Sequence, residues 1–189
     1  DTVSRYGHAA GEHARAAHDE LVARSPETRE LQMDEKWAFV AKKEKNCDED
    51  DPDDQFRGDC WDHVAFDPEH RLVVAVVPGE RTAESVRELV GDLKGRLGGR
   101  APRLITTDEY SAYEGAILEA FGTEVMPPRT GKPGRPRSPY KVPPAGLNYA
   151  TVDKTRNKGR VVEVATRVIF GTAATVAALV EGFDVVLAG

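Results

Sequence analysis

The chain has 189 residues, 40% of them hydrophobic, which suits one domain of ordinary size with a packed core. Its net charge is −6, and no run reaches the roughly 20 apolar residues of a membrane-spanning helix. The longest candidate, 173–188, is interrupted by Glu181 and Asp184. Two cysteines, Cys47 and Cys60, are too few for a disulfide framework and fit a reducing compartment. We therefore expect a cytoplasmic protein with no membrane partner.

Three strands in succession are predicted at 31–43, 60–66 and 71–77, and they should form an antiparallel meander. The first strand alternates apolar with polar residues, whereas the third is apolar on both faces, as a central strand should be. Thr82 then caps an amphipathic helix that ends at Gly98.

A fourth strand is predicted at 103–108, followed by a helix that begins with a capping box formed by Ser111 and Glu114. Further along, 149–155 and 159–170 are strand-like and indicate a hairpin. A short helix at 172–180 completes the predicted elements. The resulting order is typical of an α/β fold.

Two acids stand out by their position on strands. Asp34 lies in the middle of the first predicted strand, where its short side chain is disfavoured, and Asp108 closes the fourth. A strand that follows a meander and a helix normally lies parallel to the first strand, which would bring these two side chains together. Two ionised carboxylates repel unless a divalent cation lies between them. A solvated Asp34 on the open face of an edge strand is the alternative.

A basic segment, 129–160, contrasts with the acidic remainder of the chain, because it holds nine Lys or Arg against one acid. They are Arg129, Lys132, Arg135, Arg137, Lys141, Lys154, Arg156, Lys158 and Arg160. Such a segment indicates a polyanionic partner. Within it, 132–139 (KPGRPRSP) resembles the Arg-Pro-Arg core of minor-groove hooks, with nonspecific phosphate contact or a plain linker as alternatives.

Three stretches, DEKW from Asp34, GDCWDHVAFDPEHRLVVAVVPGERT from Gly58 and LITTDEYSAYE from Leu104, resemble DDE-type transposases of the bacterial insertion-sequence-one kind. The resemblance covers about 31–170. It implies a ribonuclease H-like fold, with a mixed sheet made of the antiparallel meander and a parallel strand, flanked by helices. It also implies that Asp34 and Asp108 are catalytic acids that bind Mg²⁺ or Mn²⁺, that DNA is the partner, and that copies self-associate during transposition.

With this resemblance, the chain divides into four parts. They are a helical lead-in (1–28), a catalytic core (29–126), a basic linker rich in Pro and Gly (127–146) and an incomplete C-terminal part with a hairpin and a short helix (147–189).

The family's third acid, a Glu on a later helix followed by Arg and a nearby Asn, has no counterpart here. Glu163 lies in a strand-like run and Glu181 precedes a glycine. We therefore expect a truncated catalytic domain that binds Mg²⁺ or Mn²⁺ weakly and does not cleave DNA. The alternatives are a noncatalytic DNA-binding or dimerising remnant, and a nuclease of the ribonuclease H kind that uses Glu84 or Glu88.

A C-x12-C-x2-H cluster of Cys47, Cys60 and His63 is weak evidence for zinc, because it offers three ligands where a structural site needs four. Free thiols are the alternative reading of both cysteines.

Replacing Arg135 and Arg137 with Ala should weaken the salt dependence of DNA binding. Each phosphate contact contributes about −0.9 to the slope of log K against log[salt], so the double variant should flatten the slope by roughly two. A salt titration of a labelled duplex measures it, and an unchanged slope would show that these side chains do not touch the DNA backbone.

Overall fold

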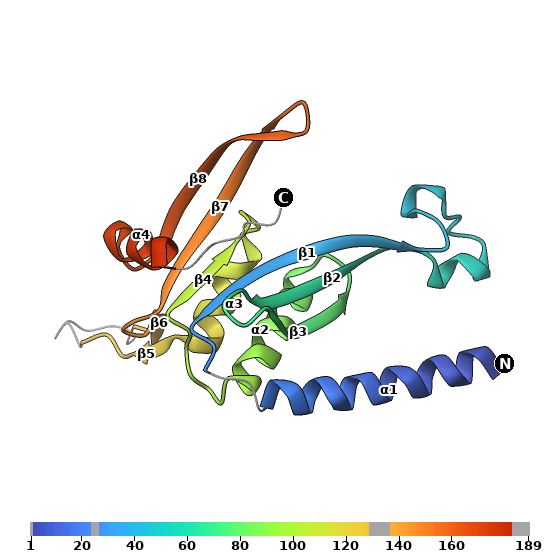
Figure 1. Cartoon of the computed structure of the whole chain (residues 1–189), viewed down its shortest axis with the longest axis horizontal. Coiled ribbons are helices and arrows are strands. Elements are labelled where there is room, and N and C mark those ends of the chain that lie inside the picture. The colour runs from blue at the N-terminus through green and yellow to red at the C-terminus, as the bar shows by residue number, and fades with distance from the viewer. Residues whose placement is uncertain (1, 24–26, 129–136, 183–189) are drawn as a thin grey trace.

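The computed structural model describes residues 2–23, 27–128 and 137–182, and it shows an α/β fold with a mixed six-stranded sheet and four helices (Figure 1). The helices are α1 (Thr2–Ala23), α2 (Ala83–Arg96), α3 (Ala112–Phe121) and α4 (Ala173–Gly182). The strands of the large sheet are β1 (Glu30–Val40), β2 (Gly58–Asp67), β3 (Leu72–Gly79), β4 (Leu104–Thr107), β7 (Asn148–Asn157) and β8 (Arg160–Phe170). Among these residues no helix combines the length and apolar character that crossing a bilayer requires.

The sheet has the strand order β3-β2-β1-β4-β7-β8. The predicted meander is confirmed, because β1 pairs antiparallel with β2, and β2 with β3. The predicted neighbourhood of the first and fourth strands is confirmed as well, with β4 parallel to β1 from Glu30↔Leu104 to Gln32↔Thr106. β7 adds to β4 in parallel, and β8 returns antiparallel to β7. β1 is thus an internal strand of the sheet.

Helices cover both faces of the sheet, and the alternation of side chains along the strands explains why. α2 and α3 pack on the face that carries Leu31, Met33 and Ile105, which are almost fully buried. Leu104 and Ala150 point to the opposite face, where they pack with the apolar side of α4 in a second, smaller core. Successive strand residues point to opposite faces, so β4 contributes to both cores.

Two long two-stranded arms extend from this body (Figure 1). β1 pairs with β4 only as far as Gln32 but stays paired with β2 to Val40, and β7 pairs with β4 only as far as Thr151 but continues to Asn157 beside β8. Because β1, β4 and β7 are parallel, both arms extend beyond the carboxyl end of β4. The acidic loop at the tip of the β1–β2 arm is held by ion pairs of Asp54 with Lys42 and Arg57.

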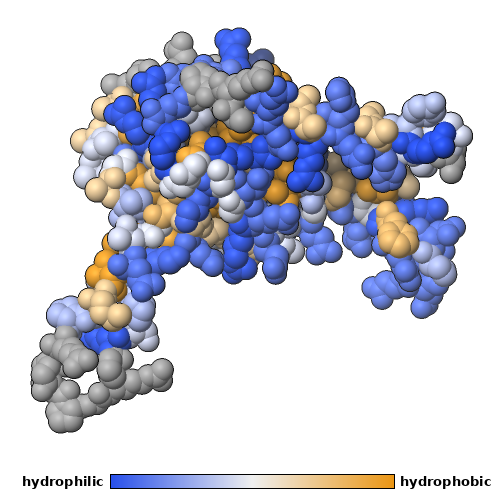
Figure 2. Space-filling view, turned by 90° about the horizontal axis from the view of Figure 1, so that it is seen from below, coloured by the Kyte–Doolittle hydropathy of each residue, from blue (hydrophilic) through white to orange (hydrophobic). Residues whose placement is uncertain are grey.

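Helix α1 contacts the body near its C-terminal end. Val22 is buried there, and the His18 ring lies with Nε2 2.7 Å from the carbonyl oxygen of Val73 on the edge strand β3. Arg96 Nη1 on α2 pairs with Asp19 Oδ1 at 2.9 Å. The face of the molecule seen from the side of α1 is mainly hydrophilic, with apolar residues in separate areas (Figure 2).

Of the two predicted helix caps, one is wrong and one is confirmed. The capping box is wrong, because Ser111 has helical backbone angles and makes no side-chain cap bond. Asp108 Oδ1 instead accepts a hydrogen bond from the Tyr110 amide at 2.9 Å, so the turn begins before Ser111. By contrast, Thr82 caps α2 as predicted, with Oγ1 3.3 Å from the Ser85 amide nitrogen. A small ribbon of β5 (Thr123–Val125) and β6 (Tyr140–Val142) was not predicted, and β6 lies within the predicted basic linker 127–146.

Glu30 is a fully buried acid at the start of β1, and neither of its carboxylate oxygens has a hydrogen-bond partner among the described residues. Burial raises the pKa of Glu30 to about 7, and the nearby charge of Asp67 adds to the rise. Asp67 itself accepts hydrogen bonds from the Thr28 hydroxyl and from the backbone amide of His70. The proton on Glu30 is therefore bound more tightly in the folded chain than in the unfolded one.

Glu30→Gln should stabilise the fold in alkaline but not in acidic buffer. A raised folded pKa contributes stability below the ordinary pKa of about 4.5, and that contribution is lost as the pH rises through about 7. At pH 8 the neutral amide should raise the free energy of unfolding by on the order of 2 to 3 kcal/mol, with little effect at pH 4.5. Urea unfolding at both pH values measures this. The exposed Glu84→Gln serves as the control, and equal effects of Glu30→Gln at both pH values would contradict the assignment.

Candidate metal centre

Three acids gather beyond the end of β4: Asp34, Glu35 and Asp108 each offer a carboxylate oxygen, and these atoms lie within 4.8 Å of one another. The prediction that the side chains of Asp34 and Asp108 come together is therefore confirmed. Carboxylate oxygens are hard ligands of the kind that Mg²⁺ and Mn²⁺ prefer. The cluster could therefore hold such a cation.

The register of two parallel strands brings Asp34 and Asp108 together. Gln32 of β1 lies opposite Thr106 of β4, and each acid follows its strand partner by two residues. Asp34 continues along β1, which is still paired with β2, while Asp108 stands just after the last residue of β4. The two carboxylates therefore reach the same level of the sheet without any special loop.

Glu35 is the acid that the sequence analysis missed. Its side chain is only 1% exposed, because it points to the same face of β1 as Leu31 and Met33. Asp34 points to the other face and is exposed, but its Oδ1 accepts a hydrogen bond from the Glu35 amide at 2.9 Å. One signal was available in the sequence, since Glu35 is the position that interrupts the apolar series 31, 33, 37, 39.

Arg81 bridges the cluster. Its Nη2 lies 3.1 Å from Glu35 Oε2 and 3.3 Å from Asp108 Oδ2, and its Nε also donates to Glu35. Its guanidinium carbon lies 5.3 Å from the ring centre of Trp61 and 4.4 Å from that of Tyr110. Partial burial lowers the pKa of Arg81. The hydrogen bonds to Glu35 and the negative charges of Glu35 and Asp108 raise it by more, so the net shift is upward and Arg81 stays charged. Arg81 precedes the helix cap Thr82, which holds it at the N-terminus of α2.

Buried polar groups surround the inner side of Glu35. His63 is fully buried, with Nδ1 4.0 Å from Glu35 Oε1 and Nε2 3.0 Å from the Glu80 carbonyl oxygen. Burial raises the pKa of Tyr113, and the neighbouring Glu35 raises it further, so its hydroxyl stays protonated. Arg81 supplies the full positive charge that compensates Glu35 among these groups. The three carboxylates and Arg81 together leave a formal charge of about −2, which one divalent cation neutralises.

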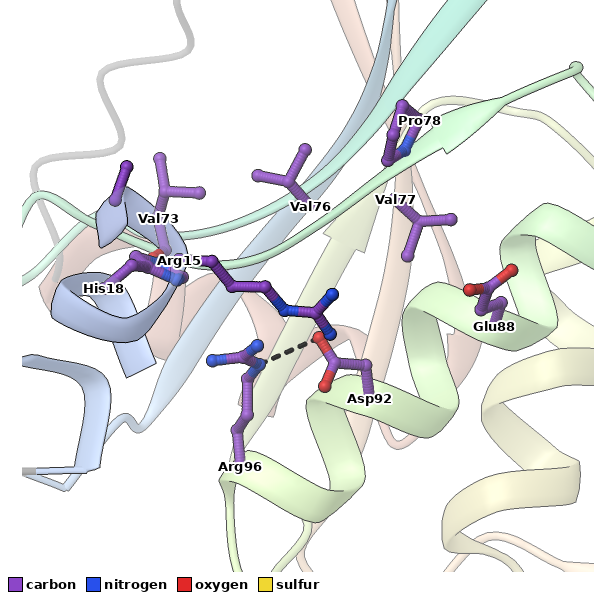
Figure 3. A pocket seen from close by; sticks show the side chains of 10 residues that line it. Arg15, His18, Val73, Val76, Val77, Pro78, Glu88, Asp92 and Arg96 are labelled. Carbon is purple, nitrogen blue, oxygen red and sulfur yellow. Dashed lines mark hydrogen bonds and ion pairs between the residues drawn. The ribbon is translucent and has the colours of Figure 1, made fainter. Parts of the chain in front are cut away.

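An open groove of about 440 Å³ lies beside the cluster. It is lined by Arg81, Asp108, Glu109, Tyr110, Ser111, Val152 and Asp153, the last two from β7. A larger groove of about 690 Å³ lies elsewhere, between α1, β3 and α2 (Figure 3). There Arg15 extends over the ion pair of Arg96 with Asp92, whose closest atoms are 2.8 Å apart (Figure 3).

Other candidate ligands do not join the cluster. Glu88 lines the groove between α1 and α2, and neither it nor Glu84 belongs to an acid group in the part of the chain that the structure describes. Glu163 pairs with Thr155 along the exposed part of β8, and the side chain of Glu181 lies outside the described residues. Within the described ranges, Cys47, Cys60 and His63 form no metal-binding group either.

The predicted polyanion contacts are scattered. Arg129, Lys132 and Arg135 lie outside the described residues, as does the side chain of Arg156. The remaining ones are Arg137, Lys141, Lys154, Lys158 and Arg160. Lys158 and Arg160 are exposed at the turn between β7 and β8, whereas Lys141 Nζ donates to the carbonyl oxygen of Glu119. Lys158 and Arg160 at the tip of this hairpin and Lys141 beside α3 therefore lie at separate places on the molecule.

Comparison with known proteins finds no family model that matches the chain, and no curated protein matches it significantly. The resemblance seen in the sequence motifs therefore stays a prediction. The cluster geometry stands independently of it, because it follows from strand register and side-chain positions.

Arg81→Gln should destabilise the fold in the absence of divalent metal. The change leaves the buried Glu35 without its cation and removes the positive charge between three acids, which costs on the order of 3 kcal/mol. Urea unfolding in EDTA measures the loss, and saturating Mg²⁺ should recover a large part of it because the cation replaces the missing charge.

Arg87→Gln is the matched control, since Arg87 pairs with Glu119 at 3.6 Å on the exposed surface and should contribute less than about 1 kcal/mol. Equal losses in the two variants, or no recovery with Mg²⁺, would contradict the role given to Arg81.

Proposed function

We propose that this chain is a catalytic domain of a DDE-type transposase of the insertion-sequence-one kind, with a ribonuclease H-like fold. The observation that carries the proposal is the meeting of Asp34 and Asp108 at one carboxylate cluster, from the middle of β1 and the end of the parallel β4. The strand order supports it, because an antiparallel meander followed by the parallel strand β4 is the arrangement that the resemblance predicts.

In this proposal, Asp34 and Asp108 hold a Mg²⁺ or Mn²⁺ ion, with Glu35 as a third carboxylate. A metal in such a site supplies Lewis acidity and activates a water or hydroxyl for attack on a phosphodiester. The protein's own contribution is positional. Glu35 is fixed by burial and by its ion pair with Arg81, and Asp108 is oriented by the hydrogen bond that it accepts from the Tyr110 amide. Arg81 also offers a positive charge next to the position that a phosphate would take.

The β7–β8 arm supplies the best placed described contacts for DNA. Lys158 and Arg160 lie exposed at its tip, and the arm extends beyond the carboxyl end of β4, past which Asp108 lies. Such side chains bind phosphates without reading sequence. The basic linker would add contacts of the same kind.

A second candidate is a noncatalytic DNA-binding remnant, and the charge of the cluster favours it for this chain alone. With Arg81 bound to Glu35 and Asp108, the remaining negative charge of the site is neutralised by about one divalent cation. In-line cleavage of a phosphodiester in this class of enzymes uses two metal ions. The third candidate, a nuclease that uses Glu84 or Glu88, receives less support because neither residue joins the described cluster.

Asp34→Asn and Asp108→Asn should each weaken Mn²⁺ binding by at least about 10-fold, since each removes a charged ligand from the site. Titration of free Mn²⁺ by electron paramagnetic resonance measures the affinity. Glu109→Gln is the control, because Glu109 lines the same groove and carries the same charge but does not belong to the cluster.

Equal losses of Mn²⁺ affinity in all three variants would show that Mn²⁺ is held by general attraction to negative charge and not by the acid cluster.

Cleavage of a supercoiled plasmid and of an RNA–DNA hybrid in Mn²⁺ separates the candidates. The proposal expects no turnover by this chain. Turnover that both Asp34→Asn and Glu84→Gln abolish would replace the proposal with a self-sufficient nuclease.

A further inference from the structure

The chain has two tryptophans, and both lie next to the acid cluster. Trp37 of β1 stands directly opposite Trp61 of β2, so the two rings share one face of the β1–β2 arm. Phe39 continues this row, with its ring centre 5.6 Å from that of Trp37. At the outer end Lys43 Nζ lies 5.0 Å from the ring centre of Trp37. Aromatic rings and a cation thus occupy one face of the arm, together with the exposed Asp59, which stands opposite Phe39.

This row begins at the candidate metal centre. The pair Glu35↔His63 precedes the pair Trp37↔Trp61 by two residues on each strand, about 7 Å along the arm. Arg81 connects the two places, because its guanidinium lies between the rings of Trp61 and Tyr110 while it bonds to Glu35. We call Phe39, Trp37, Trp61, Arg81 and Tyr110 the aromatic strip.

The outer part of the aromatic strip is exposed although the inner part of the same face is core. Leu31 and Met33 are buried beneath the helices, whereas Trp37 is 39% and Phe39 46% exposed. The helix layer ends at this level, since α2 begins just after Arg81 (Figure 1). Large rings left in solvent in a contiguous row are typical of an interaction surface.

The cations that lie against the rings of the strip favour nucleotides over a protein partner. Cations are placed against the ring faces, with Lys43 over Trp37 and Arg81 between Trp61 and Tyr110. Aromatic residues and Arg are also common in the cores of protein interfaces, whereas Lys is depleted there, so Lys43 is the contact that discriminates between the two kinds of partner. Alternating rings and cations instead match the bases and phosphates of a single strand, because every base has a face that stacks on an aromatic ring.

We propose that the aromatic strip binds unpaired nucleotides of the DNA strand whose phosphodiester lies at the acid cluster. This inference rests on the proposed function and specifies its substrate as a frayed or overhanging DNA end. Bases inside a duplex are covered by their neighbours, so stacking on Trp37 and Phe39 requires that the nucleotides are unpaired. The continuity of the strip with Glu35 and Asp108 through Arg81 determines which nucleotides they are, namely those next to the reacting phosphate.

The test compares a fluorescently labelled oligothymidylate with a blunt duplex of equal length by fluorescence anisotropy, using the whole chain. Trp37→Ala and Phe39→Ala should each weaken binding of the single strand by about 5- to 50-fold and change binding of the blunt duplex by less than about twofold. Phe56→Ala is the matched control, because Phe56 is 83% exposed in the acidic loop of the same arm but lies outside the strip. It should leave both affinities unchanged.

Intrinsic fluorescence gives a second readout, because both tryptophans belong to the strip. Oligothymidylate should quench it in the unmodified chain, and the quenching should be smaller in Trp37→Phe. This variant keeps an aromatic ring and serves if Trp37→Ala does not fold. Circular dichroism of each variant establishes that it is folded.

Three outcomes would overturn the inference. They are equal losses for single strand and blunt duplex, an effect of Phe56→Ala as large as that of Trp37→Ala, and self-association that Trp37→Ala abolishes without any change in oligonucleotide binding. The last would assign the strip to a second copy of the chain. Mn²⁺ binding distinguishes this failure from failure of the proposed function. If the chain binds Mn²⁺ through Asp34 and Asp108 but does not bind oligothymidylate, only the inference about the aromatic strip is wrong.

Discussion

The mutual repulsion of three carboxylates within 4.8 Å is the constraint on which this structure depends. At that separation each pair of charges costs roughly 1 to 3 kcal/mol, between the dielectric of water and an effective value of about 20. The fold holds the charges together because the pairing of β1 with β4 is set by buried side chains such as Leu31 and Ile105, which lie on the core face. Packing energy therefore maintains an arrangement that electrostatics opposes, and this is typical of sites built to bind a cation.

Arg81 connects this electrostatic constraint to the rest of the molecule. It compensates Glu35, touches Asp108, stacks against Trp61 and Tyr110, and immediately precedes the cap of α2. The position of the helix is thus coupled to the charge of the site. A cation bound by the acids would compete with Arg81 for the same oxygens, so binding of metal and release of the guanidinium toward a phosphate are linked by simple charge balance.

Much of the fold could be predicted from sequence because its signals are local. The meander, the cap at Thr82 and the convergence of Asp34 with Asp108 follow from strand periods and from the usual position of a fourth strand. Glu35 was missed because an alternating pattern assigns it to a buried face, where an acid is unexpected without knowledge of Arg81. The capping box failed because the short side chain of Asp108 bonds the Tyr110 amide first. The pairing of β7 with β4 joins residues about forty positions apart, and no local pattern encodes such a partner.

The two arms differ in chemistry, and the difference is consistent with a division of roles under the proposed function. The β7–β8 arm carries Lys158 and Arg160 at its tip, which suits the evenly charged backbone of a duplex. The β1–β2 arm carries the aromatic strip but ends in a loop with six acids among residues 48–54. That loop is ordered by the bonds of Asp54 to Lys42 and Arg57, so its negative charge has a fixed place beyond Lys43. A DNA strand whose bases stack on the aromatic strip would be repelled by the negative charge of this loop. The length of the aromatic strip would therefore limit the number of unpaired nucleotides that can bind to it.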